Sequence, residues 1–238
     1  MISSTEMAVV DENAEALGVP RKQLMESSGN AVARAVREIA DPGASVALVC
    51  GRGNNGGDAF VAARFLSAYD VTVHLLGRPE TISTEIAREN WVALERAEID
   101  RRTVEDSTAI DLATPDIVVD AMLGTGVTGA LREPEATAAE TINAADCPVL
   151  AVDVPSGIDA DTGEREGIAV EADRVVVEIP VSADDELLDA IASDLRDRPL
   201  RTGETIRLER PGVRATVVEA APDGTVRVTG KTSVRVRE

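Results

Sequence analysis

Residues 46–66 constrain the fold more than any other part of the chain. They begin with an apolar run, residues 46–50, which predicts a strand covered on both faces of a parallel sheet. Four glycines follow that allow positive φ and let a ligand approach the backbone: Gly51, Gly53, Gly56 and Gly57. Asp58 is suited to cap the helix predicted after them. A strand, a glycine loop and a helix N-terminus in this order favour phosphate binding.

The same loop fits G-x-G-x-x-G, which alone is a weak indication because such turns are common in α/β proteins. A dinucleotide-binding domain has an acid about 20 residues further on, for the ribose. After the apolar run 71–76 this chain instead has Gly77 and Arg78. The pair Asn54 and Asn55 is also foreign to that pattern, and its amides suggest oxygen ligation or hydrogen bonding to a polar substrate. We therefore expect a site different from that of a hydride-transfer enzyme.

The length of 238 residues predicts one large domain, or one domain with a small appendage. A net charge of −19 repels nucleic acid and acidic membranes, and it resembles the surfaces of proteins from halophilic organisms. No apolar run approaches the roughly 18 residues of a membrane span. The first six residues lack the features of a signal peptide. We therefore expect a cytoplasmic protein with neither a nucleic-acid nor a membrane partner.

The cysteines and the single histidine are expected to be core residues. Cys50 and Cys147 fall in predicted buried strands, which favours small core residues over a disulfide, a redox pair or a metal site. His74 also falls within a predicted buried strand, so a core histidine is a better interpretation than a catalytic one.

Helices and strands are predicted to alternate along residues 1–180, followed by a different pattern. Expected helices cover residues 3–17, 20–39, 59–66, 83–97 and 134–144, and expected strands cover residues 46–50, 71–76, 116–120 and 147–153. This alternation predicts an α/β fold, a three-layer Rossmann-like sandwich with a mostly parallel sheet.

Three of the predicted strands end near residues that can carry chemistry: Gly51, Asp120 and Asp153. Ligands bind outside the carboxyl ends of the strands in such sheets, so the three loops should converge on one edge. There Asn55, Asp120 and Ser156 offer the oxygen ligands that hard cations prefer. Asp153 is the best-placed acid–base group. Taken singly, each aspartate could equally cap a neighbouring turn.

Three segments resemble the YjeF N-terminal domain family, the NAD(P)H-hydrate epimerases: residues 53–58 (GNNGGD), 120–126 (DAMLGTG) and 153–157 (DVPSG). Residues 24–26 with Gly29 are similar to a helical segment of that family. The resemblance covers about residues 1–180. It implies a Rossmann-like, usually dimeric protein that interconverts the R and S epimers of hydrated NADH and NADPH (NADHX and NADPHX). A separate NAD(P)H-hydrate dehydratase repairs the S form.

The resemblance also implies roles for individual residues. Asp153 would be catalytic, as a general acid–base group, and Asn55, Asp120 and Ser156 would hold a potassium ion, K+. The residues around the substrate would be Asn54, Asn55, Gly56, Gly57, Asp58, Gly124, Thr125, Gly126, Val127, Thr128, Gly129, Ala130 and Asp153.

The chain departs from the family pattern at Ala59, where glycine is usual, and in Ser27 and Ser28, where Asn-Ala is usual. After Ile179 the family's segment bearing Thr and Lys is missing. If that lysine assists substrate binding, the affinity or even the activity of this chain is reduced. No dehydratase domain follows in the sequence, so complete repair is expected to need another protein.

Residues 181–238 are expected to form a small β-rich appendage. A helix is predicted at 184–195 and short strands near 204–208, 213–218, 225–228 and 233–236. This segment weakly resembles the second N-terminal subdomain of the valosin-containing-protein class of AAA ATPases, in residues 198–206 and 236–238. We interpret it as an interaction module or an oligomer contact, and a solvated β appendage is the alternative.

Two other functions stay open beside the epimerase. One is a non-catalytic YjeF-type nucleotide-binding or scaffold protein, and the other is a generic nucleotide enzyme that uses only the glycine loop. Asp120, Asp153 and the asparagine pair favour catalysis, because a scaffold needs none of them.

Overall fold

The computed structural model describes residues 18–160 and 162–176, and the backbone of four short strands further on. The predicted helices 3–17 and 184–195 and the predicted strand 233–236 lie outside the described residues. The chain divides into two compact units, one of residues 8–178 and one of residues 1–7 and 179–238, and each is described by itself.

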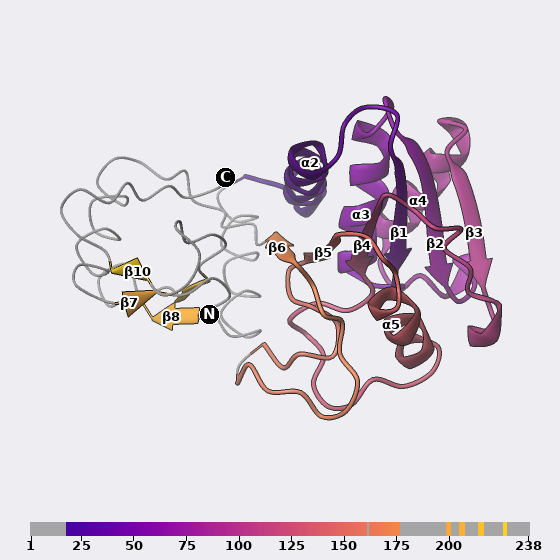
Figure 1. Cartoon of the computed structure of the whole chain (residues 1–238). Helices are drawn as coiled ribbons and strands as arrows, with labels where there is room; N and C mark the ends of the chain where they lie inside the picture. The colour runs from indigo at the N-terminus through magenta and orange to yellow at the C-terminus, as the bar shows by residue number, and fades with distance from the viewer. Residues whose placement is uncertain are drawn as a thin grey trace. The chain divides into compact units, whose positions relative to one another are not determined.

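Six parallel strands form the sheet of the larger unit (Figure 1). They are β1 Ser45–Cys50, β2 Asp70–Leu76, β3 Asp100–Val104, β4 Ile117–Ala121, β5 Val149–Val152 and β6 Arg174–Val176. Their order is β3-β2-β1-β4-β5-β6, and every neighbouring pair is parallel. This order is that of Rossmann sheets, which confirms the predicted fold.

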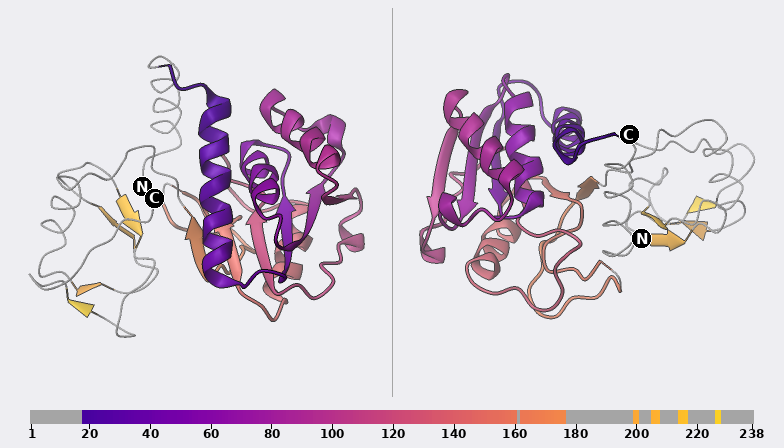
Figure 2. Two further views of the ribbon diagram at one scale, coloured as in Figure 1. Left: turned by 90° about the horizontal axis from the view of Figure 1, so that it is seen from above. Right: turned by 180° about the vertical axis from the view of Figure 1, so that it is seen from behind.

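Helices cover both faces of the sheet, so the unit has three layers (Figure 1, Figure 2). The side chains of β1 alternate between two cores, as they do in any strand. Leu48 packs in the core under α2 Arg21–Ile39, α3 Asn54–Phe65 and α4 Glu85–Arg96, and Val49 packs in the core under α5 Glu135–Asn143. Two 3-10 turns, η1 Pro79–Thr81 and η2 Ser107–Ala109, lie in the connections.

Most predicted strands and helices of the larger unit match the observed ones, with four differences: β3 and β6 were not predicted, β5 is shorter than predicted, and α3 begins at Asn54 and not at residue 59. Strand β3 was not expected, because it lies at the edge of the sheet and only Val104 among its residues is buried. Strand β5 is shorter than predicted, since the chain turns at Asp153. In the smaller unit β7 Pro199–Leu200 pairs with β10 Val226–Arg227, and β8 Thr205–Arg207 pairs with β9 Arg214–Thr216.

The histidine and one cysteine are core residues as predicted. His74 is 2% exposed, and burial, helped by the nearby Arg102, lowers its pKa to about 4. Cys50 is buried, but Cys147 is only half-buried and precedes β5, so its placement inside a buried strand was wrong. Among the described helices, none is both long and apolar enough to cross a membrane.

Candidate functional site

The order of the strands reverses between β1 and β4, and ligands of such sheets bind in the crevice outside the carboxyl ends at this point. Gly51 follows β1, and its amide donates to Ala121 O of β4 at 3.0 Å. Asp120 lies within β4, and Asp153 directly follows β5. The three segments that were predicted to converge therefore meet at one edge of the sheet (Figure 1).

The glycine loop is tighter than expected, and its glycines serve close packing. Helix α3 begins at Asn54 with Gly53 as its N-cap, so the prediction that Asp58 caps the helix was wrong. None of the four loop glycines has a positive φ. A Cβ on Gly51 would overlap Met122 O, and one on Gly56 would overlap Gly51 O. The loop needs glycine because two backbone segments touch there.

Gly124 lies against both Asp153 and Asn55. A Cβ on Gly124 would stand 2.6 Å from Asp153 Oδ2 and 3.6 Å from Cγ of Asn55. The Asp153 carboxylate accepts a hydrogen bond from Thr125 N at 2.7 Å. The structure thus brings together an acid, an amide side chain and the start of the loop 124–130.

Asp153 has an unusual backbone conformation. Its φ is 68°, and across it Val154 N donates to Val152 O at 2.9 Å. The Asp153 amide is fixed by Val176 O of β6 at 2.8 Å. A γ-turn with positive φ is rare and strained, and strain of this kind persists where surrounding contacts hold the residue, often at functional sites. Here the turn directs the carboxylate toward Thr125.

The same carboxyl group has a perturbed acidity. Burial raises the pKa of Asp153, against the opposing effect of its hydrogen bonds from Thr125. A carboxyl with a raised pKa can give up and take back a proton closer to neutral pH than an ordinary aspartate.

Asn55 lies in the first turn of α3, and both polar atoms of its side chain are buried without a hydrogen-bond partner. A buried unsatisfied polar group costs about 1–3 kcal/mol, and each such group needs an explanation, such as a ligand or an ion. The amide oxygen and the amide nitrogen are therefore both available for ligand binding.

Asp120 and Ser156 form a buried pair. The Asp120 carboxylate accepts hydrogen bonds from Ser156 Oγ at 2.7 Å, Ser156 N at 2.8 Å and Met122 N at 3.1 Å. Ser156 Oγ also accepts a bond from Leu123 N at 3.0 Å. Burial raises the pKa of Asp120 to about 6, although these hydrogen bonds oppose the shift. The pair ties the end of β4 to the loops that follow β4 and β5.

Asn55, Asp120 and Ser156 carry side-chain oxygens of the kind that hard cations prefer as ligands. Asn55 Oδ1 has no partner, and Asp120 Oδ2 keeps a lone pair beside the bond from Ser156 N. The described residues hold no group of three or more His, Cys, Asp or Glu side chains arranged for a metal. An ion at this position would therefore use the mixed set of amide, carboxylate and hydroxyl oxygens.

The remaining predicted residues differ in how far they are exposed. Asn54 is exposed at the start of α3, and Gly56 and Gly57 are buried in its first turns. Asp58 is half-buried, and its backbone oxygen packs against Gly29 of α2. The later loop residues are mostly exposed: Gly126, Val127, Thr128 and Ala130, with Gly129 half-buried at a φ of 87°.

Arg52 was missed in the sequence, although it stands inside the glycine loop. Its Nη2 atom lies 3.8 Å from Oε1 of the buried Glu135, at the start of α5. A Cβ on Gly77, after β2, would stand 3.0 Å from Arg52 Cδ. The long side chain thus extends from the loop after β1 to the residue that follows β2. The signal available in the sequence was a positively charged residue between Gly51 and Gly53.

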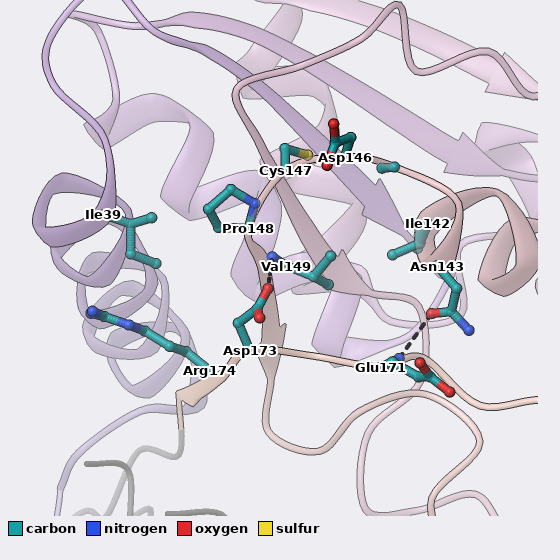
Figure 3. A pocket seen from close by; sticks show the side chains of 11 residues that line it. Ile39, Ile142, Asn143, Asp146, Cys147, Pro148, Val149, Glu171, Asp173 and Arg174 are labelled. Atoms are coloured by element: carbon teal, nitrogen blue, oxygen red, sulfur yellow. Dashed lines mark hydrogen bonds between the residues drawn. The ribbon is translucent and has the colours of Figure 1, made fainter. Parts of the chain in front are cut away.

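A hollow of about 630 Å³ lies at the opposite end of β5 (Figure 3). Its polar side chains hold the backbone: Asp173 accepts from Val149 N at 2.8 Å, and Asn143 accepts from Glu171 N at 2.8 Å. None of the predicted site residues lines it.

The sheet order and the glycine turn define a Rossmann-like α/β protein, and the acidic strand ends make the switch point its candidate ligand site. Residues 21–179 match the family model of the YjeF-related protein N-terminus. Because this match covers more than half of the chain, the chain belongs to that family. Residues 182–238 match the model of domain 2 of cell division protein 48 (CDC48).

Curated relatives and a solved structure agree with this assignment. The chain is 46% identical over 183 residues to the bifunctional NAD(P)H-hydrate repair enzyme Nnr of Methanothermobacter thermautotrophicus, covering 74% of this chain and 35% of that protein. It is 42% identical over 177 residues to the NAD(P)H-hydrate epimerase of Cenarchaeum symbiosum, covering 74% of this chain and 83% of that protein. The crystal structure of the yeast protein ynu0, YNL200c, superposes with a TM-score of 0.65 at 26% identity, covering 74% and 78%. The chain spans about a third of the length of its bifunctional relatives.

Proposed function

We propose that this protein interconverts the R and S epimers of hydrated NADH and NADPH. The observation that carries the proposal is the Asp153 carboxyl, held in a strained turn with a raised pKa beside Gly124 and the unpartnered amide of Asn55. A relative of which this chain covers 83% is named an NAD(P)H-hydrate epimerase.

Epimerisation requires that one bond at the hydroxyl-bearing ring carbon is broken and formed again on the other face. One acid–base group can serve both steps if it donates a proton when the bond breaks and accepts a proton when the bond forms again. Asp153 suits this task because its raised pKa lets both protonation states exist closer to neutral pH. The amide of Thr125 holds one of its carboxylate oxygens in place.

In this proposal the N-terminus of α3 and the loop 124–130 bind the rest of the dinucleotide. The helix N-terminus favours the pyrophosphate. Asn54, Gly56, Gly57 and Asp58 of α3 would line one side of the substrate, and the loop residues from Gly124 to Ala130 the other.

A potassium ion held by Asn55, Asp120 and Ser156 is part of the proposal. The ion would supply a positive countercharge to the buried Asp120 carboxylate, which accepts hydrogen bonds from Ser156 and Met122. It would also give the unpartnered oxygen of Asn55 a ligand.

We also propose that a dehydratase specific for the S epimer consumes the product. The bifunctional name of the Methanothermobacter relative supports a coupling of this kind. A homodimer and adaptation to high salt, from the charge of −19, remain predictions that light scattering and unfolding at different salt concentrations would test.

The test supplies the purified chain with racemic hydrated NADH and an S-specific dehydratase, and follows the return of NADH. We expect the R form to be consumed at an accelerated rate, and Asp153→Asn to lose this acceleration. Asp41→Asn, at an exposed site outside the crevice, is the matched control. If the wild type gives no acceleration and Asp153→Asn behaves identically, the non-catalytic nucleotide-binding or scaffold role is favoured instead.

A further inference from the structure

We propose that Arg52 and Arg78 form a subsite for the ribose 2′-phosphate, so that the protein prefers hydrated NADPH over hydrated NADH. This inference rests on the proposed function, because it assigns the direction in which the same dinucleotide crosses the same crevice.

One direction of the dinucleotide suits both ends of the crevice. In sheets of this order the pyrophosphate lies at the N-terminus of the helix after the first strand, and the adenosine ribose lies at the end of the second strand. Helix α3 begins at Asn54, so the nicotinamide half extends toward Asp153 after β5. The adenosine half then extends over the end of β2, toward Gly77.

The end of β2 carries a cation where an NAD site has an acid. Leu76 ends the strand, and Gly77 and Arg78 follow. An acid at this point would accept the ribose 2′-hydroxyl, whereas an arginine accommodates a 2′-phosphate. The Arg52 side chain passes beside Gly77, whose missing Cβ would stand 3.0 Å from Arg52 Cδ and 3.5 Å from Nε. Two arginines, one from the loop after β1 and one directly after Gly77, thus lie at the end of β2, where the ribose is expected.

The acidic neighbours leave these arginines available. Arg78 Nε lies 3.6 Å from Glu105 Oε2, and both side chains are more than 60% exposed. Arg52 Nη2 lies 3.8 Å from Glu135 Oε1, beyond hydrogen-bond distance, and the Arg52 side chain is 44% exposed. An exposed ion pair such as Arg78–Glu105 contributes little to stability. A phosphate dianion accepts paired, charge-assisted hydrogen bonds from a guanidinium, and it can replace a distant carboxylate as the partner.

The experiment measures the dissociation constants of NADP+ and NAD+ for the full chain by calorimetry, which requires no turnover. We expect the wild type to bind NADP+ about tenfold or more tightly than NAD+, as suits charge-assisted bonds to a phosphate. Arg52→Ala and Arg78→Ala should each reduce this ratio. Arg96→Ala, an exposed arginine in the last turn of α4, is the matched control for the lost charge.

Three results would overturn the subsite: equal affinity of the wild type for both nucleotides, tighter binding of NAD+, or an equal loss of affinity for both in the arginine variants. Undetectable binding of NADP+ would overturn it as well. The coupled epimerase assay is a separate measurement. A preserved NADP+ preference without epimerase activity would refute the proposed function and keep the subsite, whereas activity without any preference would do the reverse.

Discussion

Ser156 contacts both carboxylate oxygens of Asp120: its amide donates to Oδ2 at 2.8 Å, and its hydroxyl donates to Oδ1 at 2.7 Å. The two residues are 1% and 0% exposed and lie 36 positions apart in the chain. Because the same hydroxyl accepts from Leu123 N, one serine fixes the loop after β4 to the loop after β5. The geometry of the Asp153 site depends on these two loops.

Replacing Ser156 with alanine should therefore loosen the site and the fold together. The change removes one of the two hydrogen bonds that Asp120 Oδ1 accepts, and it removes the acceptor of Leu123 N. We expect a loss of about 1–3 kcal/mol in the free energy of unfolding, measured by urea titration. Ser27→Ala, on the exposed side of α2, should change it little, and equal stability of the two variants would contradict the bonding described.

Replacing Gly124 with alanine should affect catalysis more than stability. The new Cβ would stand 2.6 Å from Asp153 Oδ2, the end of a side chain that can move away. The carboxylate would leave Thr125 N, and kcat should fall about tenfold or more, as expected for a displaced acid–base group. Ser67→Ala is the control, because this exposed residue lies just past the C-terminal end of α3, away from the crevice. Similar kcat values for the two variants would argue against the position given to Asp153.

Asn55→Ala should separate stability from function. The variant loses an amide that is buried without partners, so its melting temperature in potassium-free buffer should match or exceed that of the wild type. Epimerase activity and the stabilisation by added K+ should both decrease, because a bound ion stabilises the folded state by mass action. The comparison uses equal concentrations of KCl and choline chloride. Marked destabilisation without K+ would show that the amide has a structural partner.

His74 makes the stability of the fold depend on pH in a defined direction. Its pKa is lowered to about 4 by burial, so between pH 4 and 6.5 the unfolded chain binds more protons than the native protein. Stability should therefore decrease as the pH falls through this window. Between pH 7 and pH 5 the wild type should lose roughly 2 kcal/mol relative to His74→Leu, measured by urea titration at each pH. Parallel pH curves for the two proteins would mean that His74 does not titrate as a buried group.

The glycine loop shows where sequence patterns were informative and where they were not. The apolar run before Gly51 predicted β1 correctly, because a strand buried on both faces is apolar throughout. The start of α3 was predicted five residues too late, since Asn54 to Asp58 are weak helix formers that tertiary contacts hold in the helix. Positions 51 and 56 require glycine because neighbouring backbone leaves no room for a Cβ, and a local sequence pattern does not reveal this contact.

The sequence by itself determined the alternation of strands and helices, the Rossmann-like class and the set of polar residues at the strand ends, because these follow from local periodicity and residue type. Only the tertiary structure decided the exposed edge strand β3, the positive φ of Asp153, the unpartnered amide of Asn55 and the reach of Arg52 over Gly77. Each of these depends on which distant segments pack together. Contacts between residues far apart in the chain are formed by folding and leave no periodic signal in the sequence.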